Sequence, residues 1–237
     1  MLSPRPWTLE SLARLLWWLL CGLAGVSLAS ALLDRALSGV PEETREFWLG
    51  FAGTLCFHGV VLAAIFAFLR ANRLTWATAF GLRRTPLRRA LGLGATAAVG
   101  FFLLNLLLMP LSALLLQLVG LDAAPQDSIE TLRSSDGFLR PVLLGFLALG
   151  VAPVMEELIF RGLLYPTIKQ LGFPRVALWG TSVLFALSHA NLLSLLPLVA
   201  LGWVQATLYE RTDNLLTPIV SHFVFNTINF VLALTVW

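Results

Sequence analysis

Two adjacent carboxylates, Glu156 and Glu157, lie in an apolar stretch long enough to cross a membrane, and Arg161 follows them. An ionisable group at that depth costs at least about 2.5 to 3.5 kcal/mol on insertion scales, so it needs a partner or a purpose. On an α-helix Glu157 and Arg161 are four residues apart and can pair, whereas Glu156 points about 100° away. An unpaired carboxylate in an apolar cavity is suited to act as a general base near neutral pH.

Two later apolar stretches each bring a histidine. One ends with Phe185 and His189, and the last carries His222 and Asn226. The four-residue spacing places the imidazole of His222 and the carboxamide of Asn226 on one helix face. A base, a histidine and two hydrogen-bond donors are the minimum set for attacking a carbonyl with water and stabilising the oxyanion.

The composition indicates which kind of element positions these residues. Of 237 residues, 58% are hydrophobic and 12% are charged, against about 25% charged in soluble domains. This excludes an ordinary water-soluble domain and favours a lipid bilayer. Cys21 and Cys56 both lie in apolar stretches, which excludes a disulfide framework and a structural zinc cluster. The net charge of +3 is explained by loop charges that orient a membrane protein, so no nucleic-acid partner is expected.

The sequence predicts an all-α fold, a polytopic transmembrane helical bundle of about seven spans. Pro110 predicts a kink, a steep tilt or an extension in the third span. With a cytoplasmic N-terminus, 12 of the 16 basic residues fall in cytoplasmic segments, as the positive-inside rule favours. The expected spans run near residues 15–33, 47–69, 90–120, 138–165, 173–189, 192–209 and 215–237.

These spans contain a conflict of depth. At 1.5 Å per residue, Glu156 lies about 13 Å from Tyr165, the expected inner end of its helix, whereas His189 lies about 24 Å from Phe173. Either the fifth helix tilts or starts below the membrane surface, or an expected boundary is wrong.

Together the three motifs resemble those of the CPBP intramembrane proteases, which include the Rce-type CAAX prenyl endopeptidases and the bacterial Abi proteins. The resemblance covers residues 138–237. It implies that Glu156 and His189 hold the attacking water and that His222 and Asn226 form the oxyanion hole. The motifs are Glu-Glu-x-x-x-Arg at Glu156, Glu157 and Arg161, Phe-x-x-x-His at Phe185 and His189, and His-x-x-x-Asn at His222 and Asn226.

The resemblance also implies a division of the chain. Residues 1–137 are expected to form N-terminal transmembrane helices, and residues 138–237 the catalytic core. Within the first part, residues 74–89 mix aromatic residues with arginines, which predicts either a short helix on the cytoplasmic interface or a solvated basic loop. Glu157 and Arg161 are supporting or substrate-binding residues: they form a structural ion pair, or Arg161 binds a substrate carboxylate.

We predict no cofactor. Glu156, His189 and His222 could formally supply the ligands of a catalytic zinc ion, and they are its ligands if a metal is present. However, the sequence has no His-Glu-x-x-His helix to fix two ligands one turn apart. A carboxylate can activate water without zinc, and Asn226 beside His222 fits an oxyanion hole better than a metal shell.

The leading prediction is an intramembrane endopeptidase that hydrolyses a peptide bond in a membrane-anchored peptide or protein tail. The alternative is a non-catalytic scaffold or bacteriocin-immunity protein of the same fold, which would tolerate loss of Glu156 or His189. A transporter usually shows inverted repeats, whereas the polar groups here occupy one half of the chain. The expected partners are the substrate and the lipid bilayer, with no prediction of oligomeric state. Fifteen arginines and a single lysine indicate a GC-rich genome, hence a bacterial inner membrane.

Overall fold

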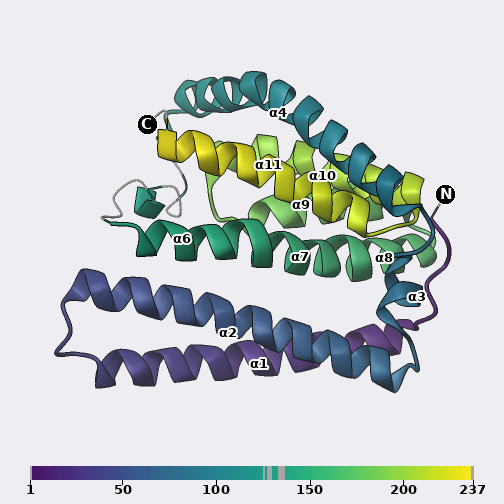
Figure 1. Cartoon of the computed structure of the whole chain (residues 1–237), viewed down its shortest axis with the longest axis horizontal. Coiled ribbons are helices and arrows are strands. Elements are labelled where there is room, and N and C mark those ends of the chain that lie inside the picture. The colour runs from purple at the N-terminus through teal and green to yellow at the C-terminus, as the bar shows by residue number, and fades with distance from the viewer. Residues whose placement is uncertain (1, 125, 127–129, 133–136, 236–237) are drawn as a thin grey trace. The chain divides into compact units, whose positions relative to one another are not determined.

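A computed structural model describes residues 2–124, 126, 130–132 and 137–235. The described chain is almost entirely helical (Figure 1). The helices outside the 139–170 stretch are α1 (Leu9–Ala36), α2 (Glu42–Ala71), α3 (Trp76–Phe80), α4 (Leu87–Leu118), α9 (Pro174–Leu187), α10 (Leu192–Thr212) and α11 (Leu216–Thr235).

Among the described residues, six helical stretches are long and apolar enough to cross a membrane: α1, α2, α4, Leu139–Gln170, α10 and α11. The polytopic all-α bundle is therefore confirmed. The fifth expected span is not full-length, because α9 has 14 residues and extends only about 21 Å. It ends at Leu187, and Ser188 and His189 form a turn. The third span is one helix that contains Pro110 and bends along its length (Figure 1).

The stretch Leu139–Gln170, here called the composite helix, alternates between α- and π-helical turns. Pro153 and Pro166 lie in the first turns of two of its α segments, each directly after a π segment. A proline has no N–H to donate and crowds the carbonyl four residues back, so a wider turn before it keeps the helix continuous. The segments of the composite helix are α6 (Leu139–Gly145), η1 (Phe146–Val151), α7 (Ala152–Glu157), η2 (Leu158–Leu164) and α8 (Tyr165–Gln170).

The chain divides into two compact units. One is Pro6–Thr75, which contains α1 and α2, and the other combines Met1–Arg5 with Trp76–Trp237. All of the candidate site residues belong to the second unit. The division expected at residue 137 rests on the family resemblance and stays a prediction.

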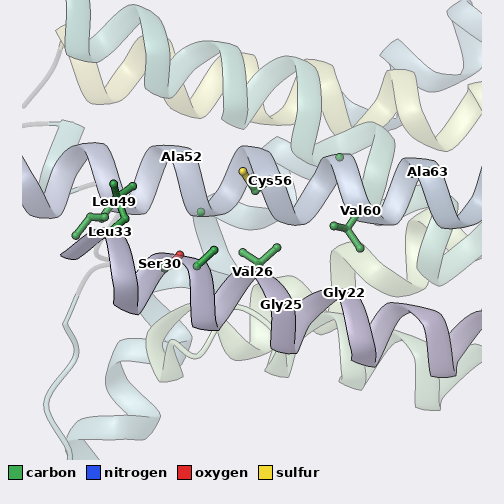
Figure 2. A pocket seen from close by; sticks show the side chains of 13 residues that line it. Gly22, Gly25, Val26, Ser30, Leu33, Leu49, Ala52, Cys56, Val60 and Ala63 are labelled. Carbon is green, nitrogen blue, oxygen red and sulfur yellow. The ribbon is translucent and has the colours of Figure 1, made fainter. Parts of the chain in front are cut away.

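In the first unit, α1 and α2 pack as a hairpin with an apolar groove of about 590 Å³ between them. Figure 2 shows Val26, Ser30, Cys56 and Val60 among the side chains that line it. Most of the lining residues are small, because seven of the thirteen are glycine or alanine. His58, in the same hairpin, places Nδ1 2.7 Å from the carbonyl oxygen of Thr54.

In the second unit, α4 and α9 both pack against α10, and α11 packs closely against α4. Glycine permits the closest approaches. A Cβ atom at Gly94 of α4 would lie 2.7 Å from the carbonyl oxygen of Thr217 in α11. Phe101, Phe185 and Phe225 belong to the buried apolar core between these helices.

The N-terminal strap, residues 2–5, also belongs to the second unit. Arg5 is buried, and its Nη2 atom donates to Tyr209 Oη at 2.6 Å and to Asp213 Oδ1 at 2.7 Å. The side-chain amide of Gln170 bonds to both the N–H and the carbonyl of Arg5. The strap thus ties the end of α8 to the end of α10.

Candidate active site

The conflict of depth came from a wrong helix boundary. The composite helix ends at Gln170 and not at Tyr165, so Glu156 lies 14 residues before its end. His189 lies 15 residues after Pro174, where α9 begins. At an α-helical rise the first separation is about 21 Å, and α9 also extends about 21 Å before it ends two residues short of His189. Both residues thus lie at a similar distance from the turn that joins the two helices.

His222 lies between the two carboxylates of the composite helix. Its Nδ1 atom is 3.2 Å from Glu157 Oε1, and its Nε2 atom is 3.8 Å from Glu156 Oε2. A carboxylate accepts hydrogen bonds, so Nδ1 carries a hydrogen and donates it to Glu157. The side chain of Glu157 is fully buried, whereas that of Glu156 is 23% exposed. Glu156 is therefore the more accessible carboxylate of the pair.

Arg161 is enclosed by three neighbours. Its Nη1 atom donates to Glu157 Oε1 at 2.9 Å, and its Nη2 atom donates to the carbonyl oxygen of Gly202 in α10 at 3.2 Å. Its guanidinium carbon lies 4.5 Å from the ring centroid of Phe185, which is a cation–π distance. Since the side chain is fully buried, this geometry favours an ion pair within the protein over a contact with a substrate carboxylate.

Phe185 connects the two candidate catalytic histidines. Its ring centroid lies 4.9 Å from that of His189 and 5.7 Å from that of His222, edge to face in both cases. Its backbone carbonyl accepts a hydrogen bond from His189 Nδ1 at 2.9 Å. The Nδ1 atoms of both histidines are thus occupied, which leaves Nε2 of each ring as the nitrogen for chemistry.

Asn226 lies one turn after His222 on α11. Its Nδ2 atom donates to the carbonyl oxygen of Ala148, in the π-helical segment η1, at 2.9 Å. A carboxamide nitrogen carries two hydrogens, so this bond fixes the side chain and leaves the second hydrogen to donate.

Gln205 of α10 is a site residue that the sequence reasoning missed. It is fully buried, and in the amide orientation that satisfies both ends it donates to the carbonyl of Pro218 and accepts from the backbone N–H of His222, each at 3.2 Å. It therefore holds the backbone of His222. The sequence feature that could have identified Gln205 is its position as a single carboxamide within an apolar span, a pattern typical of a helix–helix hydrogen bond.

The three residues that could formally bind zinc do not fit a metal site as the structure places them. Among the described residues, no group of three or more His, Cys, Asp or Glu side chains is arranged to hold a metal ion. His222 directs one nitrogen at Glu157, and its other nitrogen is 3.8 Å from Glu156. Metal independence stays a prediction.

Fold and site together define a polytopic helical membrane protein in which Glu156 and Glu157 both face His222, and Phe185 packs against both His222 and His189. Residues 138–228 match the family described as type II CAAX prenyl endopeptidase Rce1-like. Over this region the chain is thus similar to a family of CAAX-type membrane proteases, and the resemblance that the motifs indicate is confirmed.

A curated relative supports the same assignment. The chain is 34% identical over 84 residues to "Putative membrane peptidase YdiL" of Bacillus subtilis (strain 168). The match covers 35% of this chain and 34% of that protein, so the chain spans about a third of the length of the relative. No solved structure matches the chain.

Proposed function

We propose that the protein is an intramembrane endopeptidase in which Glu156 activates water to hydrolyse a peptide bond. One observation carries the proposal. Of the two adjacent carboxylates, Glu157 is fully buried and contacts Arg161 and His222. Glu156 is partly exposed, and its Oε2 atom lies 3.8 Å from His222 Nε2. An accessible carboxylate beside an imidazole is the arrangement that general-base catalysis requires.

In the proposed reaction, Glu156 takes a proton from the water that His189 orients through Nε2. The water oxygen bonds to the carbonyl carbon, and the negative charge moves to the carbonyl oxygen. Asn226 Nδ2 and His222 Nε2 donate to that oxyanion, the histidine when its ring carries both protons. The C–N bond then breaks, and the departing amine takes the proton from Glu156.

The proposed substrate is a membrane-anchored peptide or the transmembrane tail of a protein. Glu156, His222 and Asn226 lie on apolar helices of spanning length, so a substrate that is itself in the bilayer reaches them without crossing an unfavourable interface. The proposed location is a bacterial inner membrane, which agrees with the bacterial source of the relative and with the arginine-rich composition.

The decisive experiment compares the membrane and secreted proteomes of cells that produce the wild type or Glu156→Gln. Loss of a general base lowers the rate by about 10² to 10⁴, so uncleaved precursors should accumulate with Glu156→Gln. Glu10→Gln is the matched control, because Glu10 is an exposed carboxylate that pairs with Arg14 at the surface. His189→Ala should reproduce the defect with the purified enzyme and an identified substrate. Identical proteomes at equal membrane levels of both proteins would refute the proposal.

A further inference from the structure

We propose that Glu157 is the positioning residue of His222: it holds the imidazole so that Nδ1–H points inward and Nε2 faces Glu156. The inference rests on the proposed function, because it specifies how one member of that site is oriented. Glu157 is fully buried and does not reach the substrate. Its effect on the reaction must therefore pass through the groups that it contacts.

The contact with His222 determines which nitrogen is used. A neutral imidazole can carry its hydrogen on either nitrogen, and the partner of one nitrogen selects the tautomer. Here Glu157 Oε1 accepts from Nδ1 at 3.2 Å, and the ring of Phe185 packs edge to face against the imidazole. With Nδ1–H held by Glu157, a second proton binds at Nε2 and gives the doubly protonated ring that donates to the oxyanion. Without an acceptor at Nδ1, the ring is free to turn away from this orientation.

The backbone of His222 is held separately. Gln205 binds the N–H of His222 and the carbonyl of Pro218, from α10. Loss of the Glu157 carboxylate should therefore leave α11 in place and affect the ring alone. This separation makes the orientation of the ring a distinct property that can be measured.

Glu157 also neutralises the buried charge of Arg161. The test must distinguish this role from the orientation of the His222 ring. The same atom, Oε1, accepts from Arg161 Nη1 and from His222 Nδ1, while Oε2 has no hydrogen-bond partner among the residues that the structure describes. Replacing Glu157 alone would leave the guanidinium buried without its carboxylate, which by itself destabilises a protein. The test therefore needs a background from which the charge of Arg161 has been removed.

Two double variants separate the tasks: Glu157→Gln with Arg161→Met, and Glu157→Leu with Arg161→Met. Both remove the ion pair, but only the glutamine carbonyl can accept from His222 Nδ1. We expect similar thermal stability for the two. The leucine variant should lose about 10- to 100-fold in kcat at unchanged KM, the range for loss of a residue that orients a functional histidine. The glutamine variant should recover most of that loss. Equal kcat in the two variants would overturn the proposal.

A second measurement does not depend on activity. The chain has three histidines, so ¹⁵N spectra of histidine-labelled protein can be assigned with single histidine variants. His222 should be protonated at Nδ1 in the wild type and in the glutamine variant, and should lose that preference in the leucine variant. His189, which is bound to a backbone carbonyl, should not change and serves as the internal control. If the wild type cleaves nothing, the proposed function fails while the spectra still test the role of Glu157. An unchanged His222 signal in the leucine variant would refute that role.

Discussion

Gly202→Ala should destabilise the protein although alanine is the better helix former. A Cβ atom at this position would lie 2.9 Å from Ser182 Cα and 3.2 Å from Arg161 Nη2. The Ser182 atom belongs to the backbone of α9, so α9 and α10 must separate by a few tenths of an ångström. Such overpacking costs about 1 to 3 kcal/mol, whereas replacing a helical glycine by alanine gains about 1 kcal/mol. The net effect is a loss of up to about 2 kcal/mol.

Gly100→Ala is the matched control, because Gly100 is in α4 and nothing lies within 4 Å of the added Cβ atom. The two substitutions share the gain in helix propensity, so their difference in unfolding free energy isolates the overpacking cost of about 1 to 3 kcal/mol. Thermal unfolding in detergent should give a lower Tm for Gly202→Ala and an equal or higher Tm for Gly100→Ala. Gly202→Ala should also lower kcat, because the Gly202 carbonyl holds Arg161. Equal Tm values for the two variants would show that the helices do not approach as closely as described.

Three further outcomes are expected. Asn226→Ala should slow turnover of an identified substrate by about 10² to 10³, and full activity in that variant would remove Asn226 from the oxyanion hole. Exhaustive chelation of the purified enzyme should leave activity unchanged; stoichiometric zinc, with activity lost on chelation and restored by added zinc, would contradict this. Arg5→Ala should lower the unfolding free energy by about 3 kcal/mol, near the lower end for breaking a buried pair, because Asp213 keeps some solvent contact. Arg14→Ala, which breaks an exposed pair, should change it by less than about 1 kcal/mol, and thermal unfolding that ranks the two alike would refute the buried role of Arg5.

Composition and spacing predicted the membrane bundle and the helices that carry the site, because both depend on local sequence. The ends of the composite helix were less predictable. The expected boundary at Tyr165 falls directly before Pro166, and helices usually end before a proline. The helix continues to Gln170 because the π-helical segment η2 directly precedes α8 and accommodates the proline.

The contacts of His222 could not be predicted from spacing. Its partners Glu157 and Gln205 lie on two other helices, and their meeting depends on how those helices pack. Helical periodicity correctly predicted the pair of Glu157 and Arg161. It also predicted that the side chains of Glu156 and Glu157 point in different directions. In the folded chain both carboxylates face one imidazole, because the ring of His222 has a nitrogen on each side.

The N-terminal strap has a consequence for the order of assembly. Arg5 binds Asp213, which is 208 residues later in the chain, so its partner does not exist when the first helix enters the membrane. At about 5 to 20 residues per second, synthesis of the intervening chain takes about 10 to 40 seconds. During that interval Arg5 has to remain outside the apolar core, because a buried guanidinium without its carboxylate is unfavourable. Docking of the strap thus follows the synthesis of α10 and Asp213, and a bulky fusion at the N-terminus should delay this step while the helices insert normally.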